Sequence, residues 1–163
     1  VFMDYSFAPL IDIHCELLIL GSLPGIKSLC ENQYYAHPHN QFWPIMCKVL
    51  DEEFSIIYER RCSMLLKNNV ALWDVIKCAE RKGSLDAEIK NEIPNDIPAL
   101  LKNYPRIRLI IFNGSCAFTK YKKHFGMPSL PYHRVLSTSP ACAGRDYEKF
   151  LMWQKALQEI KIP

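Results

Sequence analysis

Short apolar runs, each followed by a small or polar residue, constrain the fold of this chain most strongly. Four such runs occur: Glu16–Leu20 before Gly21, Asn69–Trp73 before Asp74, Arg108–Phe112 before Asn113, and the weaker Arg134–Leu136 before Ser137. Continuous apolar runs of about four to six residues favour strands that are buried on both faces, as in parallel sheets. The sequence therefore predicts about four parallel strands.

Segments with helical spacing of apolar residues separate these runs. They cover Asn40 to about Asp51, Ile56–Lys67, Asp96–Asn103, Ser115–Phe125 and Asp146–Ile160. Pro44 is compatible with the first of these helices only because it falls in the first turn. Alternating strands and helices predict an α/β fold, a three-layer α/β/α sandwich around a four-stranded parallel sheet. A chain of 163 residues suits a single domain, residues 1–163.

Composition excludes several classes of protein. Hydrophobic residues make up 49% and charged residues 23%, close to globular averages, which argues against disorder and coiled coil. The net charge of +3 permits nucleic-acid binding without requiring it. No apolar run is long enough for a membrane helix and no secretory signal is recognisable, so we expect a cytoplasmic protein that does not contact membranes. The seven cysteines are never spaced as CxxC, so we expect reduced thiols and no zinc or iron–sulfur site.

Ligands of parallel sheets bind beyond the carboxyl ends of the strands. The residues there are small or polar: Gly21–Gly25, Asp74, Asn113-Gly114 and Ser137–Pro140. The longest connection, from Ser22 to Asn40, starts at the same edge and is rich in aromatic and polar residues. Long ordered loops over a strand edge are usually functional, and their aromatic side chains can stack on a planar ligand. The sequence therefore places a binding site at this edge.

Three other kinds of site fit the residues at this edge less well: a phosphate-binding loop, a metal site and a serine nucleophile. Gly21–Ser28 is close to the phosphate-binding GxxxxGK[ST] loop, and Asp74 imitates a magnesium-binding Asp, but Ile26 replaces the last glycine and Pro24 removes an N–H. A degenerate nucleotide hydrolase is therefore a minor alternative. His37 and His39 are separated by Pro38, which disfavours a metal site. The serines lack the G-x-S-x-G elbow of a nucleophile.

Four segments resemble the uracil-DNA glycosylase superfamily, and most closely its hypoxanthine (deoxyinosine) DNA glycosylase branch. They are Gly21-Ser-Leu-Pro-Gly25, the specific string Gln33-Tyr-Tyr-Ala-His-Pro-His-Asn40-Gln-Phe-Trp43, Phe112-Asn-Gly114 and Ser137-Thr-Ser-Pro-Ala141. The resemblance runs from about Leu17 to the last helix. It implies a monofunctional DNA glycosylase that flips out a deaminated base, hypoxanthine first and uracil as a lesser substrate, and hydrolyses its N-glycosidic bond without metal or cofactor.

The resemblance also assigns roles to individual residues. Asn40 would position the attacking water, because the first loop lacks the Asn or Asp that many relatives carry there, and Ser137 would donate a hydrogen bond to the leaving base. Ala141 stands where uracil-specific relatives carry a large apolar wedge, so either Arg145 or a residue elsewhere fills the vacated stack, or the wedge is absent. The expected base-binding residues are Ser22, Leu23, Tyr35, Phe42, Asp74 and Asn113. The expected DNA-binding residues are Lys27, Arg134, Ser139, Ala141, Gly144 and Arg145.

Asp74 is the residue we expect to read the flipped base. An ionised carboxylate only accepts hydrogen bonds, so it would pair with the N1–H of hypoxanthine and repel the bare N1 of adenine. Two alternatives stay open: Asp74 caps the following segment or pairs with Lys77. The expected partner is double- or single-stranded DNA that contains deaminated bases, bound by a monomer. The rival hypothesis is a non-catalytic nucleic-acid-binding relative, favoured by the missing polar side chain in the first loop.

Overall fold

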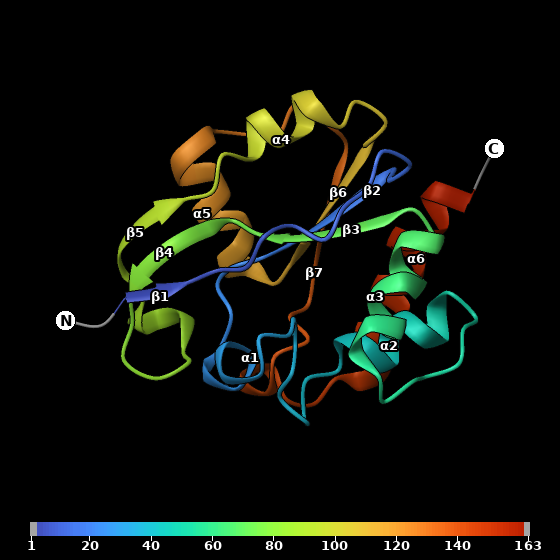
Figure 1. Ribbon diagram of the computed structural model, residues 1–163, viewed down its shortest axis with the longest axis horizontal. Helices are drawn as coiled ribbons and strands as arrows, with labels where there is room; N and C mark the ends of the chain where they lie inside the picture. Colours follow the sequence, from blue (N-terminus) through green and yellow to red (C-terminus); the bar gives the residue numbers. More distant parts are fainter. Residues whose placement is uncertain (1–2, 162–163) are drawn as a thin grey trace.

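Four parallel strands form the central sheet in the computed structural model, which describes residues 3–161 (Figure 1). Their spatial order is β3 (Val70–Asp74), β2 (Leu17–Gly21), β6 (Leu109–Asn113) and β7 (Tyr132–Val135). The predicted parallel sheet is confirmed. The first three strands end one residue later than predicted, so that Gly21 pairs with Asp74 inside the sheet. The fourth lies slightly earlier than predicted, and Leu136 is outside it.

Helices cover both faces of this sheet, as the sandwich architecture requires (Figure 1). Because side chains alternate along a strand, Leu17 and Ile19 of β2 pack with α2 (Phe42–Val49), α3 (Tyr58–Lys67) and α6 (Asp146–Lys161). Leu18 and Leu20 pack with α4 (Ile97–Asn103) and α5 (Ser115–Phe125) on the other face. The three-layer prediction is confirmed.

The predicted helices are present with small changes at their ends. α2 begins at Phe42 rather than Asn40, with Pro44 in its first turn, and α3 begins at Tyr58 rather than Ile56. Asp96 caps α4 by accepting from Ala99 N at 3.1 Å. The connection predicted as a loop between Ser22 and Asn40 contains a further short helix, α1 (Ile26–Glu31).

A second, antiparallel sheet was not predicted. It has the order β1 (Met3–Tyr5), β4 (Ile76–Glu80) and β5 (Lys90–Pro94). β4 follows β3 after the single residue Val75, and a hairpin that carries the 3-10 helix η1 (Asp86–Glu88) leads on to β5. The sheet has a small apolar cluster of its own, which includes Leu23. It brings the hairpin beside the first loop of the main sheet.

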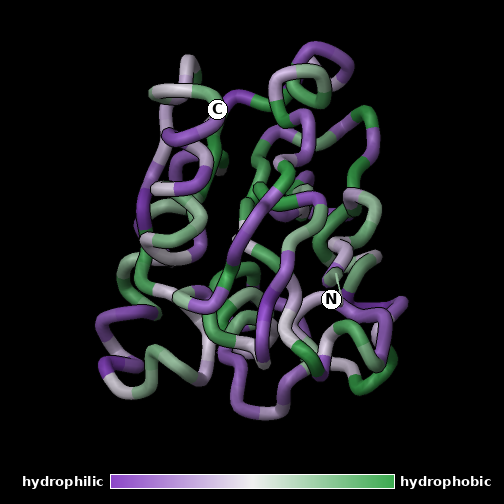
Figure 2. The backbone as a smooth tube through the Cα atoms, turned by 90° about the vertical axis from the view of Figure 1, so that its left-hand side faces the viewer, coloured by the Kyte–Doolittle hydropathy of each residue, from purple (hydrophilic) through white to green (hydrophobic). Residues whose placement is uncertain are grey.

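The distribution of hydropathy follows these layers. Green hydrophobic segments run through the centre of the molecule in Figure 2, and many of the outer loops are purple. Within residues 3–161, no helix is both long and apolar enough to cross a membrane. The seven cysteines are free thiols, of which Cys15, Cys47 and Cys78 are buried and Cys30 is exposed.

Candidate active site

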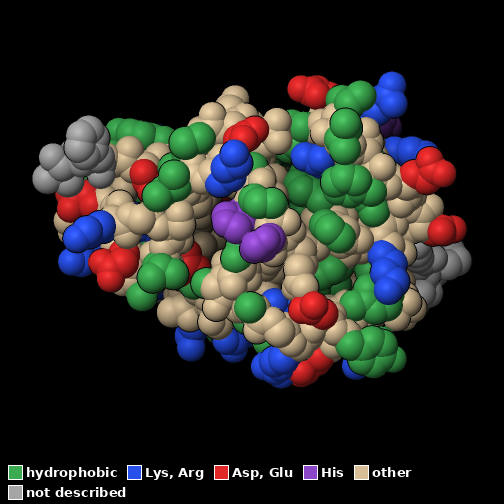
Figure 3. All heavy atoms as spheres, turned by 90° about the horizontal axis from the view of Figure 1, so that it is seen from below, with side chains coloured by type: hydrophobic (Ala, Val, Ile, Leu, Met, Phe, Trp, Pro, Cys, Tyr) green, Lys and Arg blue, Asp and Glu red, His purple; other side chains and the backbone are tan. Residues whose placement is uncertain are grey.

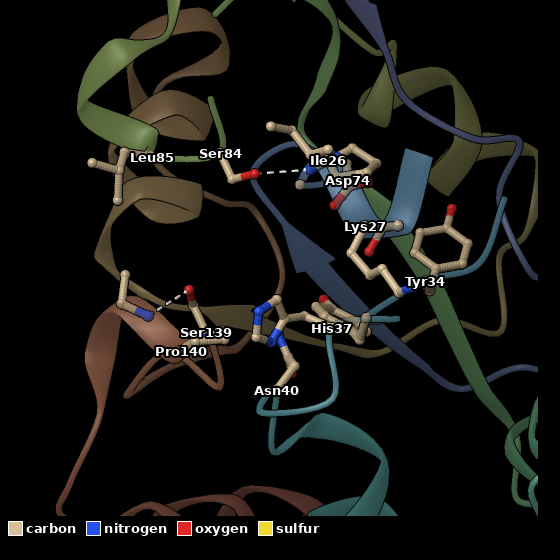
Figure 4. A pocket seen from close by; sticks show the side chains of 15 residues that line it. Ile26, Lys27, Tyr34, His37, Asn40, Asp74, Ser84, Leu85, Ser139 and Pro140 are labelled. Atoms are coloured by element: carbon tan, nitrogen blue, oxygen red, sulfur yellow. Dashed lines mark hydrogen bonds between the residues drawn. The ribbon is translucent and has the colours of Figure 1, made fainter. Parts of the chain in front are cut away.

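A cavity of about 460 Å³ opens at the carboxyl edge of the parallel sheet. This volume is in the usual range for small-molecule sites, roughly 300–1,000 Å³. Its walls come from the first loop and α1, the aromatic loop, the end of β3, the β4–β5 hairpin and the segment after β7 (Figure 4). The lining residues include Ile26, Tyr35, His37, Asn40, Asp74 and Leu85. The edge predicted from the strand ends is therefore the edge that carries the cavity.

Asp74 is the buried acid of this cavity. It is 4% exposed, and its Oδ2 has no hydrogen-bond partner among the described residues. The main-chain carbonyl of Asp74 accepts from Asn95 Nδ2 at 2.8 Å, which fixes the end of β3 while leaving the carboxyl unused. Lys77 is exposed and makes no ion pair with Asp74, so the structure contradicts the pairing alternative. A buried, unpartnered carboxyl at a cavity wall points to a ligand.

The pKa of Asp74 is raised to about 7, mainly because the carboxyl is buried; the nearby charge of Asp86 adds to the rise and that of Arg81 opposes it. The carboxylate that we expected to be permanently ionised is therefore partly protonated at neutral pH. An ionised Asp74 accepts hydrogen bonds only, whereas a protonated one also donates. The protonation state of Asp74 thus decides whether it can pair only with a donor atom of a base or also with an acceptor atom.

Tyr35 and Gly21 surround the Asp74 carboxyl. Gly21 leaves it room, since a Cβ at this position would lie 2.5 Å from Asp74 Oδ1 and 3.0 Å from Tyr35 Oη. Tyr35 has a φ of 55°, an unusual conformation for a non-glycine residue, and its hydroxyl is buried without a partner among the described residues. Phe42 stacks on Tyr35 with a centroid distance of 4.1 Å and is itself fully buried. Phe42, expected to bind the base, therefore supports Tyr35 from behind.

Asn40 and His37 belong to one tight turn at the cavity wall. Asn40 N donates to His37 O at 2.9 Å, and Asn40 Oδ1 accepts from Phe42 N at 3.0 Å. One lone pair of Oδ1 and the Nδ2 amide are left for a ligand. His37 Nδ1 accepts from His39 N at 3.0 Å, so the neutral ring carries its proton on Nε2. His37 was not among the predicted site residues, although it lies within the motif that carries the resemblance.

A buried hydrogen-bond network fixes the segment after β7 to the aromatic loop. Asn113 Nδ2 donates to Thr138 Oγ1 and Thr138 N donates to Asn113 Oδ1, both at 3.0 Å. Gln41 N donates to Thr138 O at 3.0 Å. Lys149, which is 1% exposed, donates through Nζ to Gln41 Oε1 at 3.2 Å and to the Cys142 carbonyl. Asn113 is therefore a structural member of this network and does not line the cavity.

The β4–β5 hairpin braces the first loop from the opposite side. Ser84 Oγ accepts from Ile26 N at 2.9 Å, and Ser22 Oγ donates to Asp86 Oδ1 at 2.8 Å. The Arg81 side chain, which is fully buried, donates to Leu23 O and Pro24 O and pairs with Asp4. No sequence pattern identified Arg81, Ser84 or Asp86, because these residues act only once the unpredicted sheet has formed.

Only some of the predicted residues line the cavity. Tyr35, Asn40, Asp74, Lys27, Ser139 and Ala141 line the cavity. Ser22 and Leu23 do not: Ser22 is turned toward Asp86, and Leu23 packs in the small apolar cluster. Ser137 accepts from Ser139 N at 3.1 Å and lines a separate cavity with Arg134. Gly114 packs closely against Ser137, since a Cβ on Gly114 would lie 2.9 Å from Ser137 Cβ.

The expected DNA-binding residues lie at the surface, three of them in intramolecular contacts. Lys27 pairs with Glu31 at 2.6 Å, Arg145 pairs with Glu148, and the Arg134 guanidinium lies 4.1 Å from the Phe118 ring centroid. Gly144 and Ala141 are exposed beside them. Solvent screens exposed ion pairs of this kind strongly, so phosphates can displace them. Figure 3 shows this face, with histidine side chains near its middle and basic, acidic and hydrophobic groups around them.

Metal ligands are not gathered at this site. Among residues 3–161, no group of three His, Cys, Asp or Glu side chains is placed to hold a metal ion. The arrangement instead offers a buried acid, an amide, an imidazole N–H and an aromatic wall. These groups can pair with a heterocyclic base and orient water.

Comparisons with known proteins agree on one family. The profile of the uracil DNA glycosylase superfamily matches residues 8–161. The hypoxanthine DNA glycosylase of Methanosarcina barkeri is 43% identical over 110 residues, which cover 67% of this chain and 70% of that protein. Its counterpart from Methanosarcina acetivorans is 40% identical over the same length. An NMR structure of a candidate uracil DNA glycosylase from Methanosarcina acetivorans has a TM-score of 0.86 and 31% identity, covering 98% of this chain and 99% of that one.

Proposed function

The chain belongs to the uracil DNA glycosylase superfamily and is a DNA glycosylase of base repair, and we propose that hypoxanthine is the base it preferentially releases. The observation that carries this proposal is the buried, unpartnered Asp74 carboxyl at the wall of the cavity. Deamination converts N1 of adenine from an acceptor into an N–H donor. Asp74 in its ionised form accepts that N–H and leaves the lone pair of an adenine N1 without a donor.

The same logic admits uracil as a lesser substrate. Uracil carries an N3–H that an ionised Asp74 can accept, whereas the N3 of cytosine is bare. The relatives named hypoxanthine DNA glycosylase support hypoxanthine as the preferred base.

Hydrolysis at this site relies on placement and electrostatics. Breaking the C1′–N bond builds positive charge on the sugar and negative charge on the leaving base, so fixed hydrogen-bond donors aimed at the base lower the barrier. His37, with its proton on Nε2, is one donor at the cavity wall, and we assign it the role of stabilising the leaving base in place of Ser137. Asn40 orients the water that attacks C1′. The chemistry needs no metal or cofactor.

The flipped base is expected to lie against Tyr35, with its pairing edge toward Asp74. Stacking on an aromatic ring stabilises a base by roughly 1–3 kcal/mol. Tyr35 is held rigidly by Phe42 and by its own strained backbone, so little ordering is required on binding. The proposal includes action as a monomer on single- or double-stranded DNA.

An abasic-site assay tests the proposal. A duplex with a single inosine is incubated with excess enzyme, and strand cleavage by alkali reports base release. We expect release of hypoxanthine, slower release of uracil, and none of adenine opposite thymine. Binding of the inosine duplex without any abasic product would instead favour the non-catalytic relative. The feature that favours this rival is the first loop, whose polar side chain Ser22 donates to Asp86 and is therefore not free to orient water.

A further inference from the structure

The main chain around Tyr35 is fixed on both sides. Tyr34 N donates to Tyr58 Oη at 3.0 Å, and Ala36 N donates to Ser28 Oγ at 3.1 Å. These bonds hold Tyr35 at its φ of 55°, a conformation that is costly for a non-glycine residue and persists only where the surrounding structure imposes it. The position of the Tyr35 side chain is therefore set by the fold.

The Tyr35 hydroxyl and the Asp74 carboxyl share the small space that the missing side chain of Gly21 leaves open. Asp74 Oδ1 and Tyr35 Oη both lie within 3.0 Å of the point that a Cβ on Gly21 would occupy. Tyr35 Oη and Asp74 Oδ2 are both buried, and neither has a hydrogen-bond partner among residues 3–161. Buried polar groups are nearly always paired, so an unpartnered donor beside an unpartnered acceptor indicates a site that a ligand completes.

The Tyr35 hydroxyl is a donor whose proton is free. Burial, and then the charge of Asp74, raise the pKa of Tyr35 well above its usual range, so the hydroxyl keeps its proton. The Asn113 amide lies beside this hydroxyl and lowers its pKa without reaching hydrogen-bond geometry. As a donor, that amide can approach only the lone pairs of the hydroxyl oxygen. The hydroxyl proton is therefore left to point away from Asn113, and the Asp74 carboxyl is the acceptor beside it.

An ionised Asp74 requires a second donor once a base covers it. A base that donates an N–H to Oδ2 also removes water from the carboxyl, and a buried charge with a single hydrogen bond is costly. The neighbouring Val75 N is already used, since it donates to Gly21 O at 2.8 Å. Asn95 Nδ2 donates to the main-chain carbonyl of Asp74 and not to its carboxyl. Within the part of the chain that the structure describes, the Tyr35 hydroxyl is the donor left beside the carboxyl.

We propose that the Tyr35 hydroxyl donates to Asp74 Oδ1 when a base with an N–H at its pairing edge fills the cavity, and so holds Asp74 in its ionised form. The inference rests on the proposed function, because it concerns the complex with a flipped base. Tyr35 is a positioning residue in this role: its ring lies under the base, and its hydroxyl acts on the base through Asp74. The bare N1 of adenine gains nothing from this bond, since it pairs only with a protonated Asp74.

Other charged and titratable groups surround Asp74 on the elements packed against it. They are Asp86 of η1, Arg81 after β4, and Lys27, Tyr34 and His37 at the cavity wall. Asp86 raises the pKa of Asp74 and Arg81 lowers it, whichever base is bound. All of these groups remain in Tyr35→Phe, which keeps the aromatic ring and removes only the hydroxyl. A changed pH dependence in that variant therefore reports on the hydroxyl.

The first test measures binding without base release. Single-stranded oligonucleotides of one sequence carry 2′-fluoro-2′-deoxyinosine or 2′-fluoro-2′-deoxyadenosine, because the fluorine disfavours positive charge on the sugar and slows cleavage. We expect Tyr35→Phe to bind the inosine oligonucleotide about tenfold more weakly than wild type at pH 8. At pH 5, where Asp74 is protonated, the loss should be less than about twofold. Affinity for the adenosine oligonucleotide should change by less than about twofold at both pH values.

Tyr34→Phe is the matched control for this test. It removes a neighbouring buried hydroxyl that is already paired, with the Ala8 carbonyl at 2.8 Å. Urea unfolding should show lower stability for Tyr34→Phe and unchanged stability for Tyr35→Phe, whose hydroxyl has no partner in the free protein. The pH-dependent loss of inosine affinity should occur in Tyr35→Phe alone. An equal loss for both oligonucleotides, an equal loss at both pH values, or full inosine affinity at pH 8 would each overturn the proposal.

The second test measures base release from the unmodified oligonucleotides. In single-turnover experiments at pH 8, Tyr35→Phe should release hypoxanthine about tenfold more slowly than wild type, with adenine release unchanged. A protein that binds the fluorinated inosine through Tyr35 as expected, yet releases no base, would refute the proposed function and leave the positioning role standing. Release of hypoxanthine with the same rates and pH dependence in wild type and Tyr35→Phe would overturn the positioning role and leave the proposed function standing.

Discussion

Gly21 and Asp74 are paired at the ends of neighbouring strands, and the carboxyl of Asp74 occupies the space that a side chain on Gly21 would fill. The Cβ of an alanine at position 21 would lie 2.5 Å from Asp74 Oδ1, a distance that real Cβ atoms do not show. The end of β2 is therefore shaped around the acid. Gly21 has no positive φ, so close approach alone explains the glycine.

Gly21→Ala is expected to displace the Asp74 carboxyl and slow hypoxanthine release by tenfold or more. Overpacking a buried site typically also costs about 1–3 kcal/mol of stability. The measurements are single-turnover excision and denaturant unfolding. Asp74→Ala in the same chain removes the clashing oxygen, so the double variant should be more stable than the sum of the two single changes predicts. Additive losses of stability would show that the two residues do not compete for space.

The raised pKa of Asp74 makes stability depend on pH. The folded protein holds the proton up to about pH 7, whereas the unfolded chain releases it near pH 3.8, so this group lowers the free energy of unfolding as pH rises between those values. Asp74→Asn should remove that dependence and stabilise the protein at pH 8 relative to wild type, on the order of a few kcal/mol at most.

Urea unfolding at pH 5, 6, 7 and 8 measures this difference. Asp86→Asn is the control, because removal of its charge should lower the pKa of Asp74 and shift the pH dependence downward, while its amide oxygen can still accept from Ser22. A wild-type protein whose free energy of unfolding differs from that of Asp74→Asn by the same amount at every pH would contradict the raised pKa.

Asn40→Ala is expected to slow base release by roughly 10²-fold or more, since it removes the group that orients water. The change also removes the hydrogen bond that Asn40 Oδ1 accepts from Phe42 N just before α2, a contact that contributes about 1 kcal/mol to stability. Single-turnover rates on a folded variant separate the two effects. A rate near that of wild type would remove Asn40 from the chemistry.

Lys149→Met should slow excision and lower stability, so rates are compared under conditions in which the variant is folded. The buried ammonium joins Gln41 to the Cys142 carbonyl, and its loss leaves both oxygens unpaired at a cost of about 1–3 kcal/mol each. Lys155→Met, on the same helix and exposed, is the matched control. We expect the rate of the chemical step to fall more than DNA affinity. Equal excision rates for both variants would mean that the network does not position the site.

The four apolar runs predicted the parallel sheet well because strands buried on both faces carry a strong signal. Boundaries shifted by a residue, which moved Gly21 and Asp74 into the strand ends. The second sheet was missed because its strands carry charges such as Lys77 and Glu80 beside buried residues and so lack a continuous apolar run. Arg81, Ser84 and Asp86 act through that sheet, and so no local pattern could place them.

Site residues were predictable where a strand or motif fixed them. Asp74 and Asn40 follow from a strand end and from the aromatic motif, and both line the cavity. Phe42 and Asn113 share the same motifs yet pack behind the wall, because whether a side chain faces a cavity depends on the helix and network that hold it. Lys149 was not among the predicted site residues. Its burial depends on two loops that meet only in the folded chain.

The claim that Asp74 reads the base is tested most directly by the ratio of hypoxanthine to adenine release at pH 6 and pH 8. Single-stranded substrates remove the difference in cost between flipping a mismatched and a paired base. Below its pKa of about 7 the acid can pair with both bases, and above it only with hypoxanthine, so the wild-type ratio should rise on the order of tenfold with pH. Asp74→Asn should release hypoxanthine more slowly, with a ratio that does not change with pH. A wild-type ratio that is the same at both pH values, and is unaltered in Asp74→Asn, would contradict the account.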